Sequence, residues 1–161
     1  MASELHAHRV TALTVTPGYL RSEAMLDQWG VTEEHWRDAI AKDPYFAESE
    51  TPCYVGRAVA ALAADPEVSS KCGGVFASWT LAKESGFTDL DGRPSDWGSF
   101  FPRKVREIID QDTAPSPMEL FAVRMRLHQV ERDPSAAGEA QRLRAYLDRH
   151  RAAATHGASS S

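Results

Sequence analysis

The sequence has few of the residues that build disulfide frameworks or metal sites. Only two of its 161 residues are cysteines, and Cys53 and Cys72 stand in neither a CxxC nor a CxxH pairing. A disulfide or a zinc site therefore has little support, and we expect two small buried side chains, because free cysteine is among the most buried residue types. The histidines stand in no zinc-ligand spacing, so no metal site is expected.

Long hydrophobic runs are also missing. No apolar stretch approaches the roughly 20 residues that a membrane-spanning helix needs, and residues 1–8 contain no apolar signal-peptide core. We therefore expect no membrane partner and a cytoplasmic location. The composition, 42% hydrophobic and 25% charged, is typical of a globular protein large enough to bury one core.

Positive charge is scarce in the first part of the chain. Residues 1–100 carry 8 Lys/Arg and 15 Asp/Glu, whereas the remainder carries 10 and 8. A nucleic-acid-binding protein would present a basic face, so no nucleic-acid partner is expected. The Arg-rich stretch from Arg142 to Arg151 is typical of alternating charge on a solvated helix.

The first half of the chain alternates strand and helix signals. Residues 1–8 have helix-forming composition. Val10–Thr16 is apolar on both faces except for threonines, which predicts a strand inside a parallel sheet, ended by Pro17 and Gly18. Ser22 predicts the cap of a helix over residues 23–29.

Two further helices and a second strand follow. Thr32 predicts the cap of a helix that runs to about Lys42. Thr51-Pro52 predicts a helix start, with the helix ending near Ala64. Gly73-Gly74 opens the second expected strand, residues 75–80. The expected buried stripe of the helix after Pro52 is Val55, Val59 and Leu62.

The remainder reads as a helical extension. A short helix is expected over residues 103–111, then a proline-containing linker to Pro117, then a hairpin of two helices separated by Asp133-Pro134. We expect units at 1–98 and 99–151, followed by a disordered tail at 152–161. The expected apolar faces are Leu120, Val123, Leu127 and Val130 in the first helix of the hairpin, and Leu143, Tyr146 and Leu147 in the second.

Three motifs occur in a fixed order: Val15-Thr-Pro-Gly-Tyr-Leu-Arg-Ser22, the segment Glu50-Thr-Pro-Cys-Tyr-Val-Gly-Arg-Ala-Val-Ala-Ala-Leu-Ala63, and Gly73-Gly-Val-Phe76. Over roughly residues 1–98 this order resembles the C-terminal part of a short-chain dehydrogenase/reductase. The resemblance implies an α/β chain with a partial Rossmann-type fold. The two expected strands would be the last two of its parallel sheet, with their helices and a helical C-terminal extension.

The resemblance also implies a cofactor-facing turn. In that family a Pro-Gly turn follows the sixth strand, and a hydroxyl four residues beyond the glycine faces the nicotinamide carboxamide of NAD or NADP. Here the turn is Pro17-Gly18 and the hydroxyl is that of Ser22, with the backbone N–H of Leu20 as a second contact. A serine hydroxyl can donate to or accept from an amide. A plain helix cap is the alternative role for Ser22, and both roles are compatible.

The two helices after the turn would form a lid over a small-molecule alcohol or carbonyl substrate. Ordinary packing within a core is the alternative role for each apolar side chain of these helices. The residues that would supply the apolar surface of the lid are Met25, Leu26, Trp29 and Trp36.

The family's remaining fingerprints do not occur in the sequence. No Gly-xxx-Gly-x-Gly loop is present to hold a pyrophosphate at a helix N-terminus. No tyrosine is followed four residues later by the lysine that lowers its pKa for proton exchange. We therefore expect a truncated oxidoreductase that has no catalytic residues of its own and is inactive alone. It would come from a mis-started gene, be a remnant of a gene, or be a working fragment. The sequence identifies neither the substrate nor the choice between NAD and NADP.

A second hypothesis comes from a different class of protein. The helical extension would make the chain a non-catalytic interaction or oligomerisation protein, with the apolar faces of its hairpin as the contact surface. Under either hypothesis, Val10–Thr16 would present an open hydrophobic strand edge that invites pairing with another chain. Self-association and marginal stability are therefore expected.

Overall fold

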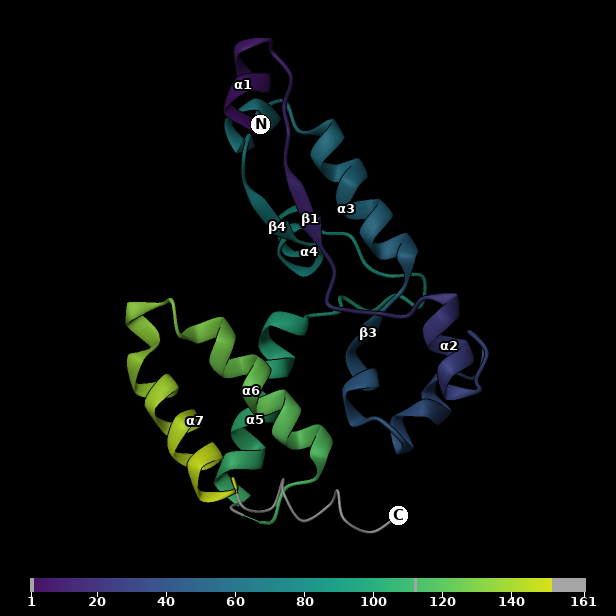
Figure 1. Cartoon of the computed structure of the whole chain (residues 1–161). Helices are drawn as coiled ribbons and strands as arrows, with labels where there is room; N and C mark the ends of the chain where they lie inside the picture. The colour runs from purple at the N-terminus through teal and green to yellow at the C-terminus, as the bar shows by residue number, and fades with distance from the viewer. Residues whose placement is uncertain (1, 112, 152–161) are drawn as a thin grey trace. The chain divides into compact units, whose positions relative to one another are not determined.

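A computed structural model places the chain in two compact units, Met1–Ser99 and Phe100–Ser161. It describes residues 2–111 and 113–151, so the expected tail at 152–161 lies outside the described residues. The chain is α/β and mostly helical, with short parallel strands in the first unit (Figure 1). None of its described helices is long and apolar enough to cross a membrane.

The first unit is built on two parallel strands. After α1 (Ala2–Ala7), β1 (Thr14–Thr16) pairs with β4 (Val75–Ala77), and Figure 1 shows them side by side. The parallel pairing was expected, but both strands are shorter than expected. Val10 lies outside β1 and is 47% exposed. The second strand stops because the Ser78 hydroxyl donates to the Glu50 carboxylate, and the chain turns there into α4 (Ser78–Ser85).

The helix expected after Ser22 is present as α2 (Glu23–Trp29). The Ser22 hydroxyl oxygen accepts from the Met25 N–H, and Gly30 ends the helix with a φ of 65°. The helix expected from Thr32 is wrong. The chain instead forms short 3₁₀ helices, η1 (Trp36–Ala41) and η2 (Pro44–Glu48), because the Glu33 side chain pairs with Arg21 and not with a helix N-terminus.

The helix expected at Thr51-Pro52 is confirmed as α3 (Pro52–Ala64), with Thr51 as its cap and Asp65 at its end. Its buried face differs from the expected one, because Val59 is 51% exposed. Tyr54 sets the face: its hydroxyl donates to the Ser95 carbonyl and its ring packs edge-on against another ring. Buried on α3 are Tyr54, Ala58 and Leu62, and the partner ring is that of Phe87.

Helices α3 and α4 cover the strand pair. Ala58 and Leu62 from α3 meet Leu81 from α4, and Val15 and Phe76 from the strands pack against them. A second parallel pair joins β2 (Tyr19–Leu20) to β3 (Ser49–Glu50). A 3₁₀ turn, η3 (Val68–Lys71), precedes β4. Of the two cysteines expected to be buried, Cys53 is exposed and Cys72 is half-buried, because Cys53 lies on the outer side of the first turn of α3.

The second unit is helical. Helix α5 (Trp97–Gln111) begins six residues before the expected start, and its first three residues belong to the first unit. Helices α6 (Pro117–Val130) and α7 (Ala137–Arg149) form the expected hairpin, joined by η4 (Pro134–Ala136). Ser116 and Glu119 form a capping box at the start of α6. The expected apolar faces lie inside this hairpin: Leu120, Val123, Val130, Leu143 and Tyr146 are buried, and Leu127 and Leu147 are half-buried.

The burial of these side chains corrects the second hypothesis. A contact surface made of the hairpin's apolar faces would require them to be accessible, but α6 and α7 use them to pack against each other. The apolar side chains that α6 exposes are different ones, Met118, Phe121 and Met125.

Candidate functional site

The turn Pro17-Gly18 leaves the carboxyl end of β1. Thr16, the last residue of β1, lies opposite Ala77, the last residue of β4, so both parallel strands end at the same edge. Ligands in open α/β sheets bind beyond the carboxyl ends of the strands. The structure therefore places Pro17 and Gly18 at the edge where a ligand of such a sheet would bind.

Leu20 lies in β2 after the turn, and the direction of its backbone N–H follows from the bond that its neighbour Arg21 makes. The N–H of Arg21 donates to the Glu50 carbonyl at 2.7 Å, so it faces β3. Because successive N–H groups of a strand face opposite sides, the N–H of Leu20 faces away from β3. It is thus not engaged in the β2–β3 ladder.

Ser22 is half-buried and caps α2. Its hydroxyl oxygen accepts from the Met25 N–H at 3.4 Å. That bond uses only a lone pair, so it leaves the hydroxyl proton able to donate. The cap role is observed, and it is compatible with a ligand contact at the same oxygen.

Three of the four expected lid residues lie on α2. Met25, Leu26 and Trp29 are half-buried and pack against a core cluster formed by Trp36, Ala39 and Phe46. Trp36 is itself only 3% exposed, so it belongs to the core beneath α2 and offers little accessible surface.

Arg21, for which the sequence predicted no role, precedes α2 and bonds a carboxylate that follows the helix. Its guanidinium is 1% exposed and bonds the Glu33 carboxylate through Nε and Nη2, at 2.8–3.0 Å. Nη1 donates to the hydroxyl and the carbonyl of Ser49, and the guanidinium carbon lies 4.2 Å from the centre of the Trp36 ring. One buried arginine therefore links the two ends of the segment formed by residues 22–32, which includes α2.

Two tyrosines of the first unit lie near the turn. Burial, with a further contribution from Asp43, raises the pKa of Tyr19 to about 12, and its hydroxyl donates to Asp43 at 2.7 Å. Burial and nearby carboxylates, Glu50 first among them, raise the pKa of Tyr54 to about 12. Both phenols therefore stay protonated near neutral pH, which does not suit a group that must exchange a proton there.

Glu50 is the second residue that sequence reasoning missed. It is fully buried, and its Oε1 accepts from the Ser78 hydroxyl at 2.7 Å. Burial raises the pKa of Glu50, whereas the hydrogen bond from Ser78 and the nearby backbone of Gly18 oppose that rise. A carboxylate directly before Thr51-Pro52 carries no sequence signal of burial, because acidic residues are common near helix N-termini.

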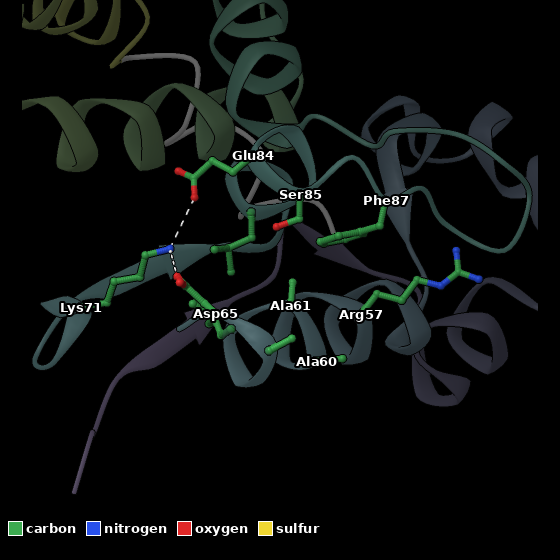
Figure 2. Close-up of a pocket in the computed structure, with 11 residues that line it drawn as sticks. Arg57, Ala60, Ala61, Asp65, Lys71, Glu84, Ser85 and Phe87 are labelled. Atoms are coloured by element: carbon green, nitrogen blue, oxygen red, sulfur yellow. Dashed lines mark ion pairs between the residues drawn. The ribbon is translucent and has the colours of Figure 1, made fainter. Parts of the chain in front are cut away.

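A groove of about 740 Å³ lies between α3 and α4 (Figure 2). Figure 2 shows the Lys71 amine pointing toward the Asp65 and Glu84 carboxylates, at 2.8 and 3.7 Å. Arg57, at the other end of the groove, donates to the carbonyls of Thr88 and Asp89. Lys71 is thus paired with carboxylates that line the groove, whereas Arg57 is bonded to neutral carbonyls.

Comparisons with known proteins bear on the family of the chain. No family model matches the chain. It is 36% identical over 95 residues to mouse "Dehydrogenase/reductase SDR family member 1", a match that covers 58% of this chain and 30% of that protein. The human protein of the same name is 37% identical over 95 residues, with the same shares. These matches confirm the resemblance to the short-chain dehydrogenase/reductase family, and the chain spans 30% of the length of these relatives.

Proposed function

We propose that the chain is part of an NAD(P)-dependent oxidoreductase that interconverts an alcohol and a carbonyl. Residues 1–98 supply the last two strands of a Rossmann-type sheet and the turn that faces the nicotinamide, and residues 99–151 are a helical extension. The observation that carries the proposal is the turn itself, at the shared carboxyl edge of two parallel strands, followed by a strand N–H directed away from its ladder.

The residues after the turn suit a nicotinamide carboxamide. An amide group needs a donor for its oxygen and an acceptor for its nitrogen. The Leu20 N–H is such a donor, and the Ser22 hydroxyl can play either part. Pro17 and Gly18 set the direction of both. NAD(P) bound there would supply the hydride, and Met25, Leu26 and Trp29 on α2 would keep water from the site.

Proton transfer is the part of the reaction that this chain does not provide. Tyr19 and Tyr54 have pKa values of about 12, and no lysine follows either at the family's spacing. We therefore expect no steady NADH or NADPH oxidation by the purified full chain with a panel of aldehydes and ketones. Sustained turnover would show that the chain holds a proton donor of its own.

Cofactor binding tests the proposal independently of turnover. NADH and NADPH are titrated into the ¹⁵N-labelled full chain, and the Leu20 and Ser22 amides should shift more than those of α7. Ser22→Ala should weaken binding about fivefold to tenfold, the loss of one hydrogen bond, and Ser22→Thr should restore it. Ser69→Ala, at an exposed serine of η3, is the control and should bind as the parent does.

Two results would contradict this assignment. The first is the absence of any shift at Leu20 and Ser22 at millimolar cofactor. The second is equal affinity in Ser22→Ala and Ser69→Ala. Since Ser22 also caps α2, thermal unfolding of each variant is measured alongside, so that a loss of binding through unfolding is recognised.

We also propose that the chain self-associates through β1. Among the described strands, β1 has β4 as its one sheet neighbour, so its other edge is open. Sedimentation of the full chain should depend on concentration, and Thr14→Lys, a charge placed on an exposed position of that edge strand, should shift it toward monomer. A monomer at every concentration would refute this proposal.

A further inference from the structure

Glu50 lies where three elements of the first unit meet. It ends β3, its Oε1 accepts from the Ser78 hydroxyl at the first turn of α4, and its Oε2 faces the Pro17-Gly18 turn. Ser78 directly follows β4 and Pro17 directly follows β1. One buried carboxyl group therefore spans the carboxyl ends of both parallel strands, at the edge assigned to the cofactor.

The contact with the turn is close. A methyl group built on Gly18 would lie 3.2 Å from Oε2 of Glu50 and 2.5 Å from Cβ of Trp97. The turn backbone thus rests directly on the carboxyl group and the indole side chain. Oε2 is buried and makes no well-formed hydrogen bond, although the Gly18 N–H lies near enough to the carboxyl to favour its charged form.

The charges around Glu50 do not neutralise it. Asp89 acts on it with like charge, and Glu50 is in turn the charge that contributes most to the raised pKa of the buried Tyr54 hydroxyl. The carboxylates of Glu48 and Asp96 lie within range of the same tyrosine. Burying an acidic group without a cation costs free energy unless its hydrogen bonds compensate. If Glu50 served only to pack, an uncharged residue of similar size would fill the same space without the cost of burying a charge.

We propose that Glu50 is a positioning residue, whose Oε2 lies against Gly18 and holds the Pro17-Gly18 turn, and which so aims the Leu20 N–H and the Ser22 hydroxyl at the nicotinamide. The inference rests on the proposed cofactor role of the turn. Ser78 anchors the other oxygen of the carboxyl, so that the start of α4 fixes where the carboxyl lies. On the turn side, Oε2 of Glu50 and the side chain of Trp97 both lie against Gly18.

NMR of the ¹³C,¹⁵N-labelled full chain tests the link without cofactor. The side-chain carboxyl carbon of Glu50 and the amide of Gly18 should titrate with one common midpoint, above the range of an exposed glutamate. In Glu50→Gln the titration of Gly18 should be lost. Asp89→Asn is the matched control, because it removes another buried carboxylate that bonds Thr51 and not the turn, and there the Gly18 titration should remain.

Ser78→Ala gives a second readout that does not depend on the folding of Glu50→Gln. The Ser78 hydrogen bond favours the ionised carboxyl, so its removal should raise the common midpoint of Glu50 and Gly18 while keeping it common. A merely structural role predicts no such coupled shift. If Gly18 titrates in Glu50→Gln as in the parent, or if its midpoint stays fixed in Ser78→Ala, the proposal is overturned.

Cofactor binding by the same variants distinguishes this inference from the proposed function on which it rests. Glu50→Gln should weaken NADH or NADPH binding at least as much as Ser22→Ala does, whereas Asp89→Asn should weaken it less once corrected for the folded fraction. If the parent chain binds neither nucleotide, the cofactor role of the turn fails. The shared titration of Glu50 and Gly18 would then still show whether Glu50 holds the turn.

Discussion

The two units of the chain are stabilised by different means. Around the turn of the first unit, charged side chains are buried and shared between elements: Arg21 with Glu33 and Ser49, and Glu50 with Ser78. In the second unit, the hairpin of α6 and α7 buries apolar side chains, and its ion pairs, such as Arg126 with Glu139, lie at the surface.

The difference separates a candidate site from a scaffold. A buried charge is costly unless it is paired and hydrogen-bonded, so a region that keeps several of them has a reason beyond stability to do so. An apolar hairpin has no such cost and no such specificity. The comparison therefore favours the first unit as the part that binds, and it can be tested by making the same change in both units.

Loss of the carboxylate from an ion pair should have the largest effect. Glu33→Ala leaves the Arg21 guanidinium, 1% exposed, without its partner, and we expect a loss of about 3 kcal/mol in the free energy of unfolding of the first unit. Glu139→Ala breaks the pair with Arg126, in which both side chains are partly exposed, and should cost about 1 kcal/mol or less. Chemical unfolding followed by amide exchange in α2 and in α7 measures each. Equal losses would remove the distinction between the two units.

A methyl group added to a glycine should have the next largest effect, with opposite signs in the two units. Gly18→Ala would press on Trp97 and Glu50 and should cost about 2 kcal/mol, as overpacking does. Gly138 lies in α7 with nothing within 4 Å of an added methyl group, so Gly138→Ala should stabilise by about 0.5 kcal/mol. Thermal unfolding of the two variants decides the signs, and a stabilising Gly18→Ala would show that the turn is not tightly seated.

Much of the helical structure follows from the sequence, because caps and hydrophobic spacing are local signals. Ser22 and Gly30 mark the ends of α2, and Thr51-Pro52 marks the start of α3, as the structure confirms. The parallel pairing of β1 with β4 followed from the resemblance to a known family. The resemblance also implied the cofactor role of Pro17 and Gly18, which stays a prediction.

The rest depended on contacts between distant parts of the chain. Glu33 reads as a helix-start residue, yet Arg21 draws it away and the expected α-helix is replaced by 3₁₀ turns. Tyr54, bonded to Ser95, rotates the buried face of α3 away from Val59. Glu50 became a candidate only once Ser78 and Gly18 were seen beside it.

Removal of a helix cap should have a smaller effect than the loss of the Glu33 carboxylate. Thr51 caps α3 and also donates its N–H to the buried Asp89 carboxylate at 2.8 Å, with its hydroxyl on the other carboxylate oxygen. Thr51→Ala should therefore cost up to about 2 kcal/mol, the upper end for a cap. Ser116→Ala removes an exposed capping box in the second unit and should cost about 1 kcal/mol. Thr51→Ser should recover most of the loss, and failure to do so would mean that the Thr51 methyl group matters more than its hydroxyl.

The last comparison is the effect of alkaline pH on two phenols of the first unit. Tyr19 and Tyr54 have folded pKa values of about 12 against an ordinary value of 10, so between those values the unfolded chain releases protons that the folded chain keeps. The free energy of unfolding of the first unit should thus fall as pH rises from 10 toward 12, and it should be unaffected by these groups below pH 10. Tyr19→Phe, which removes the phenol beside Asp43, should flatten part of that slope in denaturant titrations at a series of pH values. If the slope is unchanged in Tyr19→Phe and Tyr54→Phe alike, the first unit does not raise the pKa values of the two phenols.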